Sequence, residues 1–195
     1  MKKELLCHTF SRMPELESER IYLRRMRYTD AEDMYSYAHR EEVSRYLLWS
    51  PHPDLYHTQD YLRYIASRYA AGNFYDWAVV WRETDRMIGT CGFTSFDCAN
   101  DAAEIGYVLN PEFWGRGIAV EAVRLILAFG FERLSLHRIE ARFMEGNRAS
   151  LRVMQKVGMT FEGFRRECTL VKGAFRTIGS CAILASEYRQ GSREN

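Results

Sequence analysis

The sequence Gly115-Arg116-Gly117 stands between an apolar, strand-like run and an amphipathic, helix-like one. The backbone N–H groups that begin a helix have no partner within it, and the helix dipole adds partial positive charge there. Without Cβ atoms, the two glycines would let a phosphate approach these N–H groups, and Arg116 could add a charged hydrogen bond. On spacing alone a Gly-x-Gly pair is more simply a tight turn, so both interpretations stay open at this point.

Two well-known phosphate-binding loops are excluded by the residues around this turn. The sequence contains no GxxxxGK[ST] motif, which excludes a P-loop NTPase. It also lacks the third glycine of the dinucleotide-binding motif, and no clear βαβ unit surrounds the turn. A phosphate site at this turn would therefore belong to another class of fold.

The spacing of apolar residues predicts the elements that position the turn. Alternating or continuous apolar runs predict strands at residues 20–27, 77–81, 87–93, 103–109, 137–143, 161–171 and 177–186. Apolar spacing of three and four predicts helices at residues 28–40, 58–71, 118–131 and 147–157. Thr29 and Glu32 predict a capping box at the first of these helices. The order of elements predicts an α+β fold, a mixed α/β sandwich around one central sheet.

Length and composition are typical of a single globular domain. The chain has 195 residues, of which 47% are hydrophobic and 27% are charged. We therefore expect one domain over residues 1–195, with residues 1–18 as an N-terminal extension. The formal net charge of +1 argues against a nucleic-acid partner or an anionic membrane surface. No apolar run is long enough to cross a membrane and no signal-peptide core is present, so we expect a cytoplasmic protein.

The cysteines and histidines give no indication of a metal site. The five cysteines form no CxxC pair, which predicts reduced, mostly buried thiols rather than disulfides or zinc ligands. The five histidines are scattered without metal-ligand spacing. We therefore expect no metal in this protein.

The residues from Glu104 to Val123, EIGYVLNPEFWGRGIAVEAV, resemble the acetyl-CoA-binding motif of the GNAT N-acetyltransferases. The resemblance covers nearly the whole chain and is closest to the branch that acetylates ribosomal-protein N-termini at alanine or serine. LESERIYLRRMRYTDAEDM is similar to the first strand and helix of that branch, and MIGTCGF to its third strand. HRIEARFMEGNRASLRVMQKVGMTFEG resembles its next strand, Asn-x-x-Ser turn and Lys-x-Gly-hydrophobic ending. The resemblance implies the GNAT fold, a mostly antiparallel sheet of about seven strands, flanked by helices and splayed in the middle.

The resemblance also implies where coenzyme A would bind. In this family the glycine turn holds the pyrophosphate, which assigns that role to the amides of Trp114, Gly115, Arg116, Gly117, Ile118 and Ala119. The strand before the turn separates from its neighbour in the family. Its backbone at Tyr107, Val108 and Leu109 would then pair with the pantetheine arm, and an amide near Val108 would polarise the thioester carbonyl. The chain departs from many relatives at Glu112, where they carry Gln or Arg.

Acetyl transfer to an amine requires an acceptor for the ammonium proton, stabilisation of an oxyanion and a proton for the leaving thiolate. Glu104 shares a strand face with Gly106 and Val108, and the resemblance implies that it is the general base. A solvated surface glutamate is the alternative. In the resembling branch, a serine at the position of Ser150 is proposed to protonate the sulfur. Equally, Ser150 could cap or line the first turn of its helix.

Neighbouring polar residues could bind the remainder of coenzyme A. Asn147 could bond coenzyme A, its own backbone or both. Arg148, Arg152 and Lys156 lie on one helical stripe, and the first two are our candidates for contacts with the adenosine phosphates. A basic stripe that simply faces solvent is the alternative.

The segment between the first two predicted helices holds candidates for the acceptor site. The resemblance implies that this segment forms one wall of the acceptor groove, with Tyr46 and Trp49 as substrate-binding residues. Core packing is the alternative for both. Glu41, Glu42 and Asp54 are only a weak indication of a site for a polycation.

The sequence therefore predicts an acetyl-CoA-dependent N-acetyltransferase that transfers the acetyl group directly to a primary amine while both substrates are bound. The α-amino group of a protein or peptide N-terminus is the acceptor that we expect first. The alternatives are a small amine, such as a polyamine, an amino acid or an aminoglycoside, and a coenzyme A-binding regulator without activity. We expect a monomer or a homodimer that pairs through strands near the C-terminus.

Overall fold

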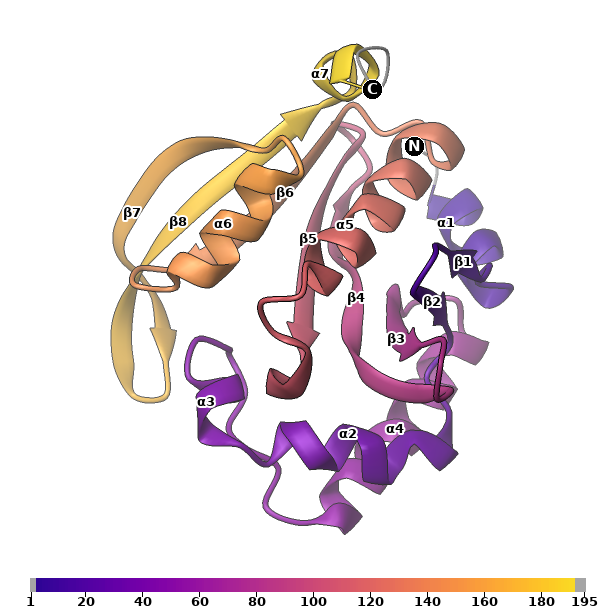
Figure 1. Ribbon diagram of the computed structural model, residues 1–195. Coiled ribbons are helices and arrows are strands. Elements are labelled where there is room, and N and C mark those ends of the chain that lie inside the picture. Colours follow the sequence, from indigo (N-terminus) through magenta and orange to yellow (C-terminus); the bar gives the residue numbers. More distant parts are fainter. Residues whose placement is uncertain (1–2, 192–195) are drawn as a thin grey trace.

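The computed structural model describes residues 3–191, which fold around one eight-stranded sheet (Figure 1). The strand order is β1-β2-β3-β4-β5-β6-β8-β7, and every neighbouring pair is antiparallel except β5 and β6, which are parallel. The strands are β1 Leu16–Glu17, β2 Ile21–Arg24, β3 Asp76–Trp81, β4 Arg86–Asp97, β5 Ala102–Leu109, β6 Arg138–Met144, β7 Thr160–Val171 and β8 Ala174–Leu184. The predicted α+β class is confirmed, and the strand beyond the seven expected is the two-residue β1.

Helices lie on both sides of the sheet (Figure 1). They are α1 Lys3–Ser11, α2 Ala31–Ala38, α3 Glu41–Ser44, α4 Leu55–Ala70, α5 Ile118–Ala128, α6 Arg148–Lys156 and α7 Ala185–Gly191. Helix α5 packs on β2, β4 and β5, whereas α2 packs on α4 and on β4. The four predicted helices are present. Helices α1, α3 and α7 are additional and were not predicted.

The first two side chains of β3 point to opposite sides of the sheet, and that of Trp77 packs in the apolar core beside α5. Trp77 is fully buried, and its ring centroid lies 5.6 Å from that of Phe10 in α1 and 5.5 Å from that of Phe129 after α5. Successive side chains of a strand point to opposite faces. The side chain of Asp76, directly before Trp77, therefore faces the side of the sheet on which α2 and α4 lie.

The capping box expected from Thr29 and Glu32 is wrong. Residues Tyr28–Asp30 form a 3-10 turn, and helix α2 begins at Ala31. The carboxylate of Asp30 accepts the Arg27 N–H at 2.7 Å and both terminal nitrogens of Arg24 at 2.7 Å. This buried ion pair fixes the chain between β2 and α2, and it takes the place of a Thr29 cap.

Two further boundaries differ from the sequence prediction. Helix α4 starts three residues before Thr58, because the Asp54 carboxylate accepts the His57 N–H at 2.8 Å and caps the helix there. Helix α5 ends at Ala128 and continues as one π-helical turn, Phe129–Arg133. The turns expected at residues 83–85 and 172–173 are both present between their strands.

Candidate active site

Strands β5 and β6 separate partway along their length, which opens the centre of the sheet (Figure 1). They pair only from Ala102 to Ile105 on β5 and from Arg138 to Ala141 on β6. From Gly106 onward, β5 is paired with β4 alone. The predicted splay is therefore present, and one edge of the Tyr107–Val108 backbone faces the gap.

The glycine turn at the end of this strand has the backbone geometry of an anion site. Gly115 and Gly117 have φ values of 76° and 78°, a left-handed conformation that favours glycine. A Cβ atom on Gly115 would meet nothing within 4 Å, and one on Gly117 would meet only Arg20, at 3.8 Å. Gly117 is the N-cap of α5 and no side chain caps this helix, so its first N–H groups are available to a phosphate. The turn thus fits the pyrophosphate of coenzyme A.

Arg20, in the loop before β2, forms hydrogen bonds that fix the glycine turn. Its Nη1 donates to the carbonyl oxygen of Arg116 at 3.0 Å, and its Nε donates to Glu121 of α5 at 2.8 Å. Ser18 donates to the same Glu121 carboxylate at 2.6 Å. The guanidinium of Arg116 lies 5.4 Å from the ring centroid of Phe113. The turn is therefore fixed by its neighbours in the fold.

The backbone of Leu109 is also held by the residues of the glycine turn. The indole N–H of Trp114 donates to the Leu109 carbonyl at 2.7 Å. Pairing of the Tyr107, Val108 and Leu109 backbone with the pantetheine arm stays a prediction. Trp114 itself is 48% exposed, at the outer edge of the turn.

Ser150 and Tyr107 form a hydroxyl pair beside the splay. The two side-chain oxygens lie 2.8 Å apart, and the one hydroxyl hydrogen of Tyr107 can be directed either to the Ser150 Oγ or to the Ser150 carbonyl oxygen, 3.0 Å away. Burial raises the pKa of the Tyr107 phenol well above its ordinary value, although the hydrogen bond with Ser150 opposes this rise. Both hydroxyls are therefore protonated at neutral pH and can donate protons.

Asn147 is the N-cap of α6, and this settles one alternative for Ser150. The Asn147 side-chain oxygen accepts the Ser150 N–H at 3.1 Å, so the cap is Asn147 rather than Ser150. Arg148 and Arg152 are exposed on the same helix. Their contacts with adenosine phosphates stay a prediction.

Glu104 is held by an arginine from the neighbouring strand. The Glu104 carboxylate, whose side chain is 15% exposed, forms an ion pair with Arg142 of β6. The hydrogen bond to Glu104 raises the pKa of the Arg142 guanidinium, although burial opposes this. Glu104 is thus not the freely solvated surface residue of the alternative interpretation.

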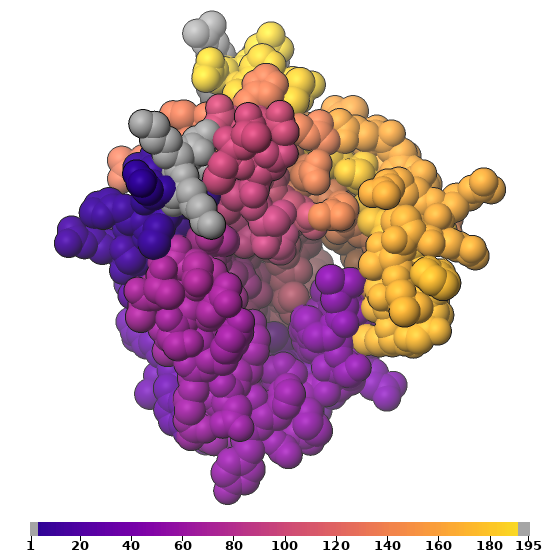
Figure 2. Space-filling view, turned by 180° about the vertical axis from the view of Figure 1, so that it is seen from behind, coloured from indigo at the N-terminus to yellow at the C-terminus, as the bar shows by residue number. Residues whose placement is uncertain are grey.

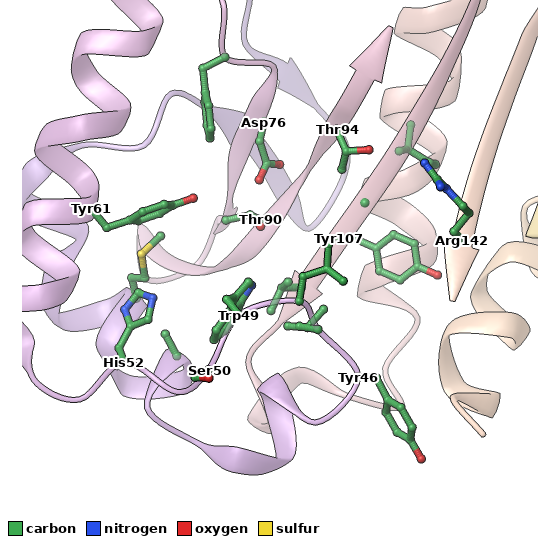
Figure 3. Close-up of a pocket in the computed structure, with 18 of the residues that line it drawn as sticks. Tyr46, Trp49, Ser50, His52, Tyr61, Asp76, Thr90, Thr94, Tyr107 and Arg142 are labelled. Atoms are coloured by element: carbon green, nitrogen blue, oxygen red, sulfur yellow. The ribbon is translucent and has the colours of Figure 1, made fainter. Parts of the chain in front are cut away.

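A cavity of about 1420 Å³ lies between the β4–β6 face and the segment from α2 to α4. Figure 2 shows the molecule hollowed between the segment around α3 and the β7–β8 hairpin. A hydrogen bond links the two sides, from the Lys172 Nζ of the hairpin turn to the Ser44 carbonyl at 2.7 Å. Glu104, Tyr107, Val108 and Arg142 all line the cavity, so it reaches the splayed strands (Figure 3).

Tyr46 and Trp49 both line this cavity, as the sequence predicted (Figure 3). The three acidic residues named for a polycation, Glu41, Glu42 and Asp54, are not among the lining residues. The described acids that do line it are Asp76 and Glu104. Glu112, the departure from many relatives, bonds Arg40 at 3.1 Å instead of entering the cavity.

Sequence reasoning missed Asp76 and Arg142 as site residues and missed the hydroxyl of Tyr107. Arg142 lies on the polar side of the alternating run at residues 137–143, and this pattern alone is typical of a solvated face. Asp76 stands directly before a strand of apolar residues, where an acid usually ends a turn. Its burial depends on α2 and α4 packing over it, and no local pattern contains that information.

No group of His, Cys, Asp and Glu side chains within residues 3–191 is arranged to hold a metal ion. Cys91 and Cys181 are buried, Cys98 is half-buried, and Cys7 and Cys168 are exposed. The expectation of mostly buried thiols is therefore wrong. Of the helices described, none is both long and apolar enough to cross a bilayer.

Known proteins are similar to this chain in sequence and in fold. The family described as acetyltransferase (GNAT) domain matches residues 20–160. The uncharacterized N-acetyltransferase p20 of Bacillus licheniformis is 34% identical over 176 residues, which are 90% of this chain and 99% of that protein. A GNAT-family acetyltransferase of known structure from Bacillus anthracis has a TM-score of 0.80 and 26% identity, covering 89% of this chain and all of that one.

A ribosomal-protein-S5-alanine acetyltransferase from Vibrio fischeri also has this fold. Its TM-score is 0.71 at 21% identity, over 90% of this chain and 98% of that chain. At this identity the likeness concerns the fold alone. Because the family match spans most of the sequence and the glycine turn and splayed strands are both in place, this chain belongs to the GNAT family and is an acetyl-CoA-dependent N-acetyltransferase.

Proposed function

We propose that the enzyme transfers the acetyl group directly from coenzyme A to a primary amine, and that this amine is the α-amino group of a protein or peptide N-terminus. The observation that carries the proposal is the size and position of the cavity. At about 1420 Å³ it exceeds the roughly 300–1,000 Å³ of most small-molecule sites, and it reaches the backbone at Tyr107 and Val108. Such a cavity has room for the first residues of an extended peptide.

Glu104 is the proposed acceptor of the ammonium proton. Its carboxylate lies on the cavity face of β5, where it is paired with Arg142 of β6. An ionised carboxylate can take the proton directly or through one water molecule. The amine then reacts in its neutral, nucleophilic form.

Ser150 is the proposed proton donor to the leaving thiolate, with Tyr107 behind it. The 2.8 Å contact between the two hydroxyl groups lets Tyr107 replace the proton that Ser150 gives up. A backbone N–H of β5 near Val108 is the proposed partner of the thioester carbonyl, because beyond Ile105 this strand has left β6. Coenzyme A bound at the glycine turn supplies the acetyl group.

A small amine with more than one positive charge is the second candidate acceptor. The observation that favours it is the pair of carboxylates, Asp76 and Glu104, in one largely aromatic cavity. A cation is stabilised both by carboxylates and by aromatic faces.

The test is release of free thiol from acetyl-CoA in the presence of a panel of amines. The panel holds peptides with different first residues, polyamines, free amino acids and aminoglycosides. We expect peptides to be acetylated, and Glu104→Gln to lower kcat about 10²–10⁴-fold, the usual contribution of a general base.

The matched control is Glu140→Gln on the neighbouring strand. Glu140 stands opposite Glu104 in the β5–β6 register but does not line the cavity, so its variant should keep the wild-type rate. Equal loss in the two variants, or full activity in Glu104→Gln, would contradict the role of Glu104. Acetylation of small amines without any peptide would contradict the N-terminal acceptor.

A further inference from the structure

Asp76 at the start of β3 is a buried carboxyl group that the acetyl-transfer chemistry leaves without a role. The residue lines the cavity, and its Oδ1 is closed off from solvent without a hydrogen-bond partner among the residues that the structure describes. Figure 3 shows its carboxyl group on the side of the cavity that Tyr61 and Thr90 also line. A carboxylate with one oxygen unpartnered in such a place is costly unless a ligand compensates its charge.

The groups that face Asp76 provide no positive charge. They are the phenols of Tyr37 in α2 and of Tyr61 and Tyr69 in α4, together with Thr90 and Cys91 in β4. Burial raises the pKa of the Asp76 carboxyl to about 7, although hydrogen bonds from the Thr90 side chain and the Trp77 N–H oppose this rise. The carboxyl is thus able to ionise near neutral pH when a cation arrives.

Much of the rest of the cavity wall is neutral or aromatic, although the guanidinium of Arg68 keeps its positive charge. Burial lowers the pKa of His52 to about 4, so this imidazole is neutral at neutral pH. Of the two lining arginines, Arg142 is paired with Glu104, and Arg68 lies 5.7 Å from the Tyr64 ring centroid and donates to the Asn73 carbonyl. Aromatic side chains make up much of the remaining wall, namely Tyr46, Trp49, Tyr61, Tyr64, Phe74 and Tyr75. Their faces can stabilise an ammonium group.

The sheet register links Asp76 to the splayed strand. Asp76 stands opposite Gly92 of β4, and Gly92 stands opposite Gly106 of β5. Neither glycine carries a side chain into the cavity, and a Cβ atom on Gly92 would be 2.8 Å from the Asp76 Oδ1. Two strand spacings separate Asp76 from Gly106, about 10 Å between their Cα atoms. A short aliphatic chain lying along this row would reach from Asp76 to the reacting amine beside Val108.

We propose that Asp76 binds a second cationic group of the acceptor, so that the preferred amines carry another positive charge at the end of a short aliphatic spacer. This inference rests on the proposed function, because it assumes that the reacting amine lies at the splay between β5 and β6. Two sources offer this chemistry: a free diamine, and a peptide with a lysine at or next to its N-terminus.

The experiment compares kcat and KM for amine pairs that differ only in the second charge. Putrescine is compared with n-butylamine, and the peptide Ser-Lys-Ala with the same peptide carrying norleucine in place of lysine. We expect the wild type to favour the dication of at least one pair by about tenfold or more in kcat/KM. Asp76→Asn should remove that preference mainly by raising KM, and Asp76→Glu, which keeps the charge, should restore part of it.

Glu41→Gln is the matched control, because Glu41 is an exposed acid of α3 outside the cavity lining. It should keep the wild-type preference. Preference in the first pair alone identifies a diamine, and preference in the second pair alone identifies a basic peptide; either supports the inference. A wild type without preference, an Asp76→Asn variant that keeps it, or an equal loss of kcat for charged and uncharged amines would overturn it. If amines without a second charge are still acetylated, the proposed transfer reaction stands although this inference fails. If no amine is acetylated, both the reaction and this inference are overturned.

Discussion

At the scale of single residues, the hydroxyl pair of Tyr107 and Ser150 joins two elements at the point where the chemistry is proposed. Tyr107 belongs to β5 and Ser150 to α6, and the Asn147 cap fixes the backbone of Ser150. A serine alone is a weak acid, and once it has given up its proton it needs another. Because the Tyr107 phenol stays protonated, it can supply that proton.

This pair predicts strongly non-additive mutations. Ser150→Ala and Tyr107→Phe should each lower kcat, by about 10²-fold for a general acid, with smaller effects on the KM for acetyl-CoA. The double variant should be little slower than the slower single variant, because either change interrupts the same proton path. A double-mutant cycle of kcat measures this, and effects that multiply would show that the two hydroxyls act independently.

Asp76 predicts an unusual dependence of stability on pH. Its pKa is raised in the folded protein, from an ordinary 3.8 to about 7, so the carboxyl binds its proton more tightly folded than unfolded. The contribution of this group to the free energy of unfolding is fully present below about pH 4 and is lost as the pH rises to about 7. Above that pH the free energy of unfolding no longer changes through this group, and the total loss is at most about 4 kcal/mol.

Asp76→Asn removes this ionisation from the folded protein. The free energy of unfolding of the variant, relative to the wild type, should therefore increase between about pH 4 and pH 7. Urea unfolding at several pH values measures the difference. Asp60→Asn on α4, an exposed carboxylate paired with Arg63, should show no such trend. A constant difference for Asp76→Asn would contradict the burial of an unpaired carboxyl.

Asp76 and Glu104 also show how far single site residues can be predicted from the sequence. Glu104 stands at a fixed distance from the glycine turn, so the motif identifies it. Asp76 lies 28 positions before Glu104 in the chain and becomes a cavity residue only through the β3–β4–β5 register. Residues brought together by strand register leave no spacing signal in one sequence.

At the scale of elements, the glycine turn shows a local pattern that does predict its structure. A strand, two glycines and an amphipathic helix predict unpaired N–H groups at the start of the helix, and the helix start has no side-chain cap. The positive φ values of the two glycines are an addition from the structure. The turn is supported by Arg20 and Glu121, which are far apart in the sequence. That support is a tertiary feature and could not be predicted.

Gly115→Ala separates the phosphate contact from backbone strain. The added Cβ meets no protein atom, but it occupies the open space in front of the turn, so the affinity for acetyl-CoA should fall about tenfold or more. The left-handed conformation should also cost about 1–2 kcal/mol of stability. Calorimetric titration with acetyl-CoA and thermal unfolding measure the two effects.

Gly173→Ala in the β7–β8 turn is the matched control. Its φ is 78°, and a Cβ there also meets nothing within 4 Å, so the strain is the same. This variant should lose similar stability and keep the wild-type affinity for acetyl-CoA. Equal affinity losses at both positions would mean that strain, and not a phosphate contact, explains the effect at Gly115.

At the scale of the whole molecule, a few polar contacts hold α2, which lies on the cavity side, to the sheet. Arg24 of β2 and Asp30 before α2 form a buried, bidentate ion pair, and Asp33 of α2 accepts the Met87 N–H of β4 at 3.0 Å. The class of fold, the seven longer strands and four of the helices could be predicted, because each has its own apolar periodicity. The two-residue strand β1 and the helices α1, α3 and α7 could not be predicted, since tertiary contacts stabilise them.

Asp30→Ala should therefore destabilise the whole protein. It leaves the Arg24 guanidinium buried and unpaired, which typically costs about 3–5 kcal/mol. Glu17→Ala, which breaks an exposed pair with Arg82, should change stability little. Urea unfolding of both variants checks this, and a loss at Asp30 as small as that at Glu17 would show that the buried pair is not what fixes α2 to the sheet.

The central claim is that acetyl-CoA at the glycine turn and the amine in the cavity meet at one splayed pair of strands and react directly. The most direct test is the initial rate with both substrates varied, using the best amine of the panel. Direct transfer predicts double-reciprocal plots that intersect, because both substrates must be bound together. Parallel lines, with an acetylated enzyme detected by mass spectrometry after acetyl-CoA alone, would show a covalent intermediate and contradict the account.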